Sequence, residues 1–162
     1  MAKHTKKEQR LQTLVSKYMH LKYPKKHFVF DVAAGLHFKS QGIKRLVAMW
    51  RSEDKLPDGY LFVARGKWHT LMLELKTIEA CPFKIDGTLK SNEHVEGQAA
   101  RHEELKADGM CATFAVGIDN ALEIIEWYMD GAEGEIPMYK PVSKKGDLFS
   151  VYKSANNAKR RK

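Results

Sequence analysis

The chain has 162 residues, 43% of them hydrophobic, and a formal net charge of +8 at pH 7. This length suits a single domain with its own core, and the positive charge favours an anionic partner, nucleic acid first, although many basic proteins are merely soluble. The spacing of Cys81 and Cys111 indicates neither a zinc site nor a disulfide framework. Without a signal-peptide pattern or a run of 18 apolar residues, we expect a soluble cytoplasmic protein.

The N-terminal third predicts a helix, a strand and a second helix. Residues 5–22 have the spacing of an amphipathic helix, whose apolar face carries Leu11, Leu14, Val15, Tyr18 and Met19. Thr5 and Glu8 fit a T-x-x-E capping box, which would begin this helix. Residues 27–33 predict a strand, and residues 36–50 have a helical pattern that Gly42 weakens.

A β-hairpin follows, because two runs of strand-forming residues, 60–64 and 68–76, are joined by a turn at residues 65–67. Residues 77–91 predict a loop. A helix over residues 92–108 then ends at Gly109, a strand covers residues 110–116, and a helix capped by Asp119 continues to about Met129. Residues 148–152 predict a last short strand.

The predicted order of elements is therefore α-β-α-β-β-α-β-α. Strands that alternate with helices indicate an α/β fold, with a mixed central sheet covered by helices on both faces. We expect one domain over residues 1–153 and a disordered, basic tail over residues 154–162, which ends in the sequence KRRK and could bind DNA nonspecifically.

The ends of the hairpin carry two acids and a lysine. A turn centred on Gly66 places Asp58 opposite Glu74, and strand alternation puts Glu74 and Lys76 on one face while Leu75 points to the other. Opposed like charges destabilise a hairpin, whereas Mg²⁺ is bound by one or two carboxylates. The Leu75 carbonyl could add a third oxygen, and the cluster suggests metal-assisted phosphodiester hydrolysis. Alternatively, Lys76 simply forms an ion pair with either acid.

These residues resemble the motif of the PD-(D/E)xK nuclease superfamily and, within it, the VRR-NUC family of virus-type replication-repair nucleases. The resemblance covers roughly residues 5–130 and rests on Pro57-Asp58, Glu74-Leu75-Lys76, Gln98 on the next helix and Gly109 before a strand. Standalone members bear a glutamate on an N-terminal helix, which Glu8 matches. The chain departs from the family pattern in its longer loop from Ile78 to Glu93.

The resemblance implies a restriction-endonuclease-like core and a Mg²⁺-dependent DNA endonuclease, in which Mn²⁺ can replace Mg²⁺. Asp58 and Glu74 would bind the metal, and Glu8 could complete the site. Lys76 would be the catalytic lysine, and Gln98 would orient groups near the metal or the scissile phosphate. Standalone members resemble Holliday-junction resolvases, so the resemblance also implies a homodimer that acts on branched DNA in DNA repair. We expect a bacterial or phage-encoded protein.

Several alternatives stay open. The capping box alone would explain Glu8, Gln98 could be an exposed helix residue, and Asp31 is better explained as an edge or turn acid than as a site residue. The basic residues before the hairpin could contact phosphates or form a solvated helix face; they are Lys39, Lys44, Arg45 and Arg51. The histidines at positions 37, 94 and 102 lack metal-ligand spacing. The protein could also be a noncatalytic nucleic-acid-binding module or a sequence-specific restriction-type nuclease.

Overall fold

The computed structural model describes residues 2–30 and 56–141, with side chains from Lys6 onward. The predicted helix over residues 36–50, the strand over residues 148–152 and the basic tail lie outside the described residues. So do Asp31, His37 and the four basic residues proposed to contact phosphates, which are Lys39, Lys44, Arg45 and Arg51.

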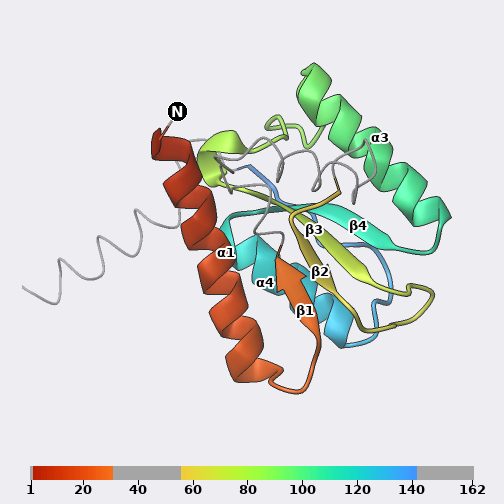
Figure 1. Cartoon of the computed structure of the whole chain (residues 1–162). Coiled ribbons are helices and arrows are strands. Elements are labelled where there is room, and N and C mark those ends of the chain that lie inside the picture. Colours follow the sequence, from red (N-terminus) through yellow and green to blue (C-terminus); the bar gives the residue numbers. More distant parts are fainter. Residues whose placement is uncertain (1, 31–55, 142–162) are drawn as a thin grey trace, which may run out of the picture.

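A four-stranded mixed sheet forms the centre of the fold (Figure 1). Its strands are β1 (Phe28–Phe30), β2 (Gly59–Leu61), β3 (Leu71–Lys76) and β4 (Cys111–Val116), in the order β1-β2-β3-β4. The first three are antiparallel to one another, and β3 is parallel to β4. Helices α1 (Ala2–Lys22) and α4 (Gly117–Met129) cover one face, and α3 (Glu93–Ala107) covers part of the other. The predicted α/β class is confirmed.

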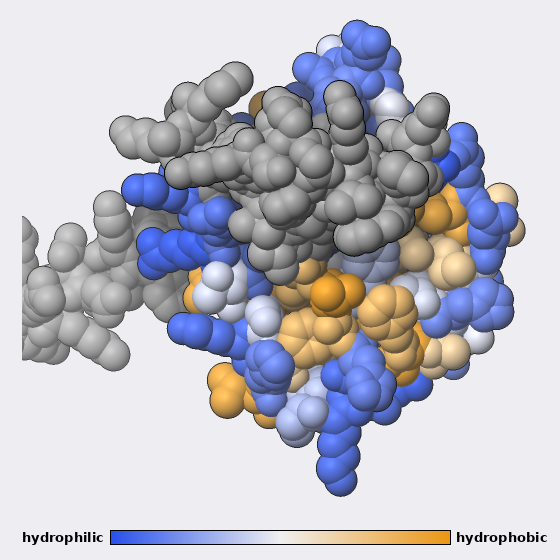
Figure 2. All heavy atoms as spheres, in the orientation of Figure 1, coloured by the Kyte–Doolittle hydropathy of each residue, from blue (hydrophilic) through white to orange (hydrophobic). Residues whose placement is uncertain are grey.

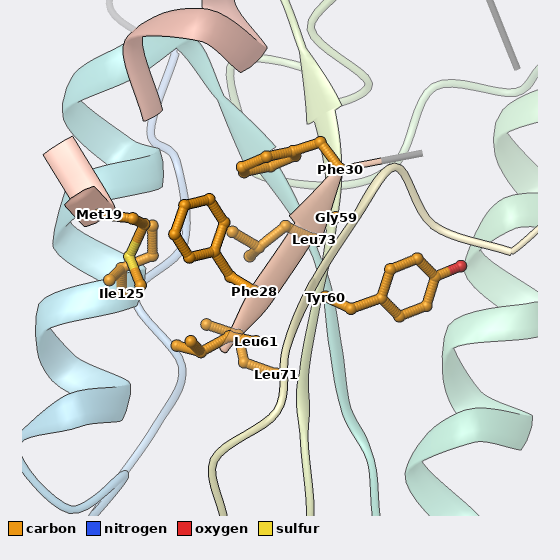
Figure 3. Close-up of a pocket in the computed structure, with 9 residues that line it drawn as sticks. All are labelled: Met19, Phe28, Phe30, Gly59, Tyr60, Leu61, Leu71, Leu73 and Ile125. Atoms are coloured by element: carbon orange, nitrogen blue, oxygen red, sulfur yellow. The ribbon is translucent and has the colours of Figure 1, made fainter. Parts of the chain in front are cut away.

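The larger hydrophobic core lies between the sheet and the pair formed by α1 and α4. From α1 it takes Leu11, Val15 and Met19, one residue from each successive turn, whereas the predicted face was wider and included Leu14, which is 42% exposed. Alternate residues of β3 and one face of α4 complete it: Leu71, Leu73, Leu75, Ala121, Ile124, Ile125 and Tyr128. Figure 3 shows side chains from α1, α4 and the first three strands meeting on this side of the sheet.

A smaller core lies on the opposite face, beneath α3. Phe83 and Phe114 meet edge to face here, with ring centroids 5.9 Å apart, and Val95 and Ala99 of α3 pack against them. The helix begins at Asn92, whose side chain accepts hydrogen bonds from two backbone N–H groups of the first turn. It ends as predicted before Gly109, whose φ of 82° places it in the left-handed region that glycine adopts without strain.

The hairpin has the predicted register but shorter strands. Tyr60 pairs with Met72 and Leu61 pairs with Leu71, as a turn centred on Gly66 requires. Regular pairing stops at Leu61, because the backbone N–H of Val63 bonds to the carbonyl of Leu61 instead of to β3. The hydroxyl group of Tyr128 donates to the Val63 carbonyl at 2.6 Å, so α4 holds this irregular segment.

Three predicted local features are wrong. Helix α1 begins at Ala2, so Thr5 lies inside it and cannot be its cap. Helix α4 has Val116 as its N-cap, and Asp119 lies in its first turn, where a negative charge favours the helix dipole. The segment predicted as a loop over residues 77–91 contains a short 3-10 helix, Ile78–Ala80, and a bridge between Phe83 and Leu89.

Candidate active site

Two carboxylates meet where β2 begins and β3 ends. Asp58 follows the buried Pro57 and precedes β2, and Gly59 pairs with Leu73, so the register places Asp58 opposite Glu74. The Asp58 Oδ2 atom accepts a hydrogen bond of 2.9 Å from the backbone N–H of Leu75. Strand pairing is thus extended by a side chain, which fixes the Asp58 carboxylate beside β3.

Glu74 is the centre of a buried polar cluster on the α3 face. The ammonium group of Lys76 lies 2.8 Å from Glu74 Oε1, and these side chains are only 13% and 10% exposed. Gln98 of α3 donates a hydrogen bond from Nε2 to the same oxygen. The long segment between Ile78 and Glu93 therefore still allows α3 to bring Gln98 to β3.

The electrostatics of Asp58 reflect this crowding. Burial first, and then the nearby charge of Glu74, raises the pKa of Asp58 to about 7. The hydrogen bond from Leu75 and the charge of Lys76 act in the opposite direction without compensating fully. Two acids that disfavour each other's ionisation are the arrangement that a bound cation stabilises.

Glu8 approaches this cluster from the other side of the sheet. It is half-buried, while its neighbours Lys7 and Gln9 are exposed, and it lies one turn before Leu11 on the buried face of α1. Its charge also raises the pKa of Asp58. Since Thr5 does not cap α1, the capping box no longer explains this glutamate.

An ion pair holds the beginning of α1 near the end of β3. Lys7 bonds to Glu79, which lies three residues beyond Lys76 in the chain. Sequence reasoning missed this contact, because a lysine and an exposed glutamate 72 residues apart carry no recognisable signal. The pair orients the turn of α1 that contains Glu8.

The donor set suits a hard divalent cation. Within the described residues, no three His, Cys, Asp or Glu side chains gather as a metal-binding group, so the protein's carboxylates here are the pair Asp58 and Glu74. Mg²⁺ needs only one or two carboxylates, because it keeps several waters and is shared with substrate phosphates. The buried Oε1 atom of Gln98 has no hydrogen-bond partner among the described residues, which leaves an acceptor beside Glu74 for a donor or cation.

The remaining histidines and the apolar gap take no part in this cluster. His94 is exposed, and His102 is buried with its ring centroid 4.6 Å from that of Phe114, so both have the structural or solvent-facing positions predicted for them. A gap lined by Met19, Phe28 and Ile125, among others, lies on the α1 side of the sheet and has no charged side chain in its lining (Figure 3).

Among solved structures, the chain is similar to a protein described as a VRR_NUC domain protein. The alignment covers 83% of this chain and 96% of the other, with a TM-score of 0.53 and 24% sequence identity. The chain has the fold of that VRR_NUC domain. No protein-family model and no curated protein matches the sequence. Over the described residues, no helix is long and apolar enough to cross a membrane.

Proposed function

We propose that this protein is a metal-dependent DNA endonuclease that hydrolyses phosphodiester bonds. The observation that carries the proposal is the cluster of Asp58, Glu74, Lys76 and Gln98 at the end of the β2–β3 pair. It occupies a fold shared with a VRR_NUC domain protein, and the net charge of +8 suits a polyanionic substrate.

Asp58, Glu74 and the Leu75 carbonyl would hold Mg²⁺, or Mn²⁺ in its place, with Glu8 completing the site. The metal would supply Lewis-acid activation of the phosphate and of the attacking water. Burial of Asp58 and Glu74 keeps both acids in a fixed geometry, so binding requires little rearrangement.

Lys76 has the role of stabilising negative charge. Its ammonium group has three donors, one of which bonds to Glu74, and it lies beside the oxygens that would contact the phosphate. A buried cation in this position stabilises the charge that develops on a phosphate oxygen during attack by water. Gln98 fixes the orientation of Glu74 through its amide N–H group.

We further propose that the enzyme acts as a homodimer and prefers branched DNA such as Holliday junctions. The basis is the resemblance to standalone VRR-NUC nucleases. Two active sites related by a twofold axis would cut two strands of a junction symmetrically.

The test is incubation of labelled four-way junction, flap and linear DNA with the protein, with Mg²⁺ and with EDTA. We expect Mg²⁺-dependent cleavage, fastest for the junction, that Lys76→Met abolishes. Lys106→Met is the matched control, because it removes another lysine that forms a 2.8 Å ion pair with a glutamate. Absence of cleavage of all three substrates by folded protein would refute the enzymatic proposal and favour a noncatalytic DNA-binding module. Discrete bands from plasmid DNA would instead favour a restriction-type nuclease.

A further inference from the structure

The face of the sheet that carries Asp58 and Glu74 also carries two aromatic side chains. Asp58, Tyr60 and Phe62 alternate along one strand and its extension, since the backbone N–H of Phe62 still bonds to the His27 carbonyl of the β1 side at 2.9 Å. Alternate residues of a strand share a face, so the two rings lie on the side that α3 partly covers. Tyr60 lies two residues from Asp58, which is about 7 Å along a strand.

These rings are accessible because α3 packs over β4 and not over β2. Phe62 is 55% exposed, Val29 beside it on β1 is 45% exposed, and Tyr60 is half-buried. Figure 3 shows the Tyr60 ring directed away from the apolar side chains that fill the other side of the sheet. Figure 2 shows hydrophobic side chains gathered in the middle of the molecular face that carries β1, with hydrophilic ones around them.

The two rings share one orientation. Their planes differ by 9°, and their centroids are 6.2 Å apart. An exposed phenylalanine that packs into no core contributes little to folding, whereas parallel rings on an open strand face match a stacking surface for flat ligands.

We propose that Tyr60 and Phe62 form a stacking platform for unpaired DNA bases next to the active site. This inference rests on the proposed nuclease function and defines its substrate more closely, as a strand whose bases are unpaired beside the scissile phosphate. The occupant follows from three observations: parallel exposed rings, a shared strand face with Asp58, and a positive net charge that attracts a polyanion. A base-paired duplex cannot use this platform, because its bases are already stacked on one another.

The experiment is a thermodynamic cycle of DNA binding, measured by fluorescence anisotropy in EDTA. The probes are a fluorescein-labelled single strand, the same strand with abasic sites in place of its central bases, and the blunt duplex. We expect Phe62→Ala and Phe62→Leu to weaken binding of the intact single strand about tenfold and to leave binding of the abasic strand and the duplex unchanged. Phe62→Trp should retain the wild-type affinity. Ile85→Ala is the control, because it truncates an equally exposed apolar side chain on the loop after β3.

Two results would overturn the platform. One is a Phe62→Leu protein that binds the intact single strand like the wild type. The other is an equal loss of affinity for the intact and abasic strands, because the lost contact is then not with a base. If Phe62→Ala alters the sedimentation coefficient but leaves single-strand binding unchanged, the rings form an interface between copies and the proposal is wrong. Cleavage assays separate the two proposals, since the platform can fail in an active nuclease and can hold in an inactive one.

Discussion

The two faces of the central sheet use the same strands for different purposes. On the α1–α4 face, β3 contributes Leu71, Leu73 and Leu75 to a continuous core. On the α3 face, the intervening residues include Glu74 and Lys76, and the apolar cluster beneath α3 is small. The strand therefore obtains its stability from one face and can carry two buried charged groups on the other.

This division matters because buried charges cost stability. A carboxylate taken from water is destabilised unless it is paired and hydrogen-bonded, and the raised pKa of Asp58 shows that its pairing is incomplete. The larger core on the opposite face offsets this cost. The faces should therefore respond differently to substitution, with activity lost on one and stability lost on the other.

The largest expected effect is on activity, at the α3 face. Asp58→Asn should reduce cleavage of junction DNA by at least about a hundredfold, because it removes a ligand charge, while an amide oxygen can still accept the bond from Leu75. The free energy of unfolding in EDTA should stay equal or rise, because the repulsion between Asp58 and Glu74 is removed. Urea denaturation and initial cleavage rates measure the two quantities. A variant that loses stability and activity together would remove the distinction between the faces.

The second effect is on stability, at the α1–α4 face. Leu71 is fully buried, so Leu71→Ala should lower the free energy of unfolding by about 2–5 kcal/mol. Ile78→Ala truncates a side chain that is 62% exposed and should change it by less than about 0.5 kcal/mol. Urea denaturation of both variants is the measurement. Equal losses would show that burial in this core does not determine stability.

A third effect depends on pH and concerns the support beneath the site. Burial, followed by the charges of Lys106 and Lys76, lowers the pKa of His102 from 6.5 to about 4, while Glu103 acts in the opposite direction. The unfolded chain therefore takes up a proton below pH 6.5 that the folded protein takes up only near pH 4. The contribution of His102 is fully present above pH 6.5 and falls by roughly 2 kcal/mol at pH 5.

His102→Leu isolates this term. The acid Asp58, whose pKa is raised, gains stability over part of the same pH range, so the quantity to compare is the change between pH 7 and pH 5 in the wild type and in the variant. The wild type should lose more stability than His102→Leu by that amount. Parallel pH profiles of the two proteins would show that His102 is not buried in its neutral form.

Local patterns in the sequence predicted those parts of the fold that depend on neighbouring residues. Strand alternation and a glycine turn were enough for the register that opposes Asp58 and Glu74. The position of Gly109 at the end of α3 followed from the left-handed conformation that ends helices. These features depend on backbone geometry over a few residues, which the sequence displays directly.

Features that depend on tertiary packing could not be predicted in this way. The start of α1 at Ala2 overrides a capping pattern at Thr5, and the contact between Lys7 and Glu79 joins distant segments. The accessibility of Phe62 depends on where α3 lies over the sheet, and no periodicity within the strand reveals that. The sequence alone therefore indicated the acids and the lysine, but not what surrounds them.

The smallest predicted effect concerns the link between the α3 face and its site. The Asn92 side chain accepts hydrogen bonds from the N–H groups of His94, at 3.0 Å, and Val95, at 3.3 Å, in the turn that precedes Gln98. Asn92→Ala should lower the free energy of unfolding by about 1 kcal/mol, whereas Asn92→Asp should retain the cap. Because Gln98 orients Glu74 from this helix, loosening of its first turn should also slow cleavage severalfold at a temperature where the protein remains folded. If Asn92→Ala loses stability but cleaves at the wild-type rate, the orientation of Glu74 does not depend on the beginning of α3, and the strand alone positions the carboxylate.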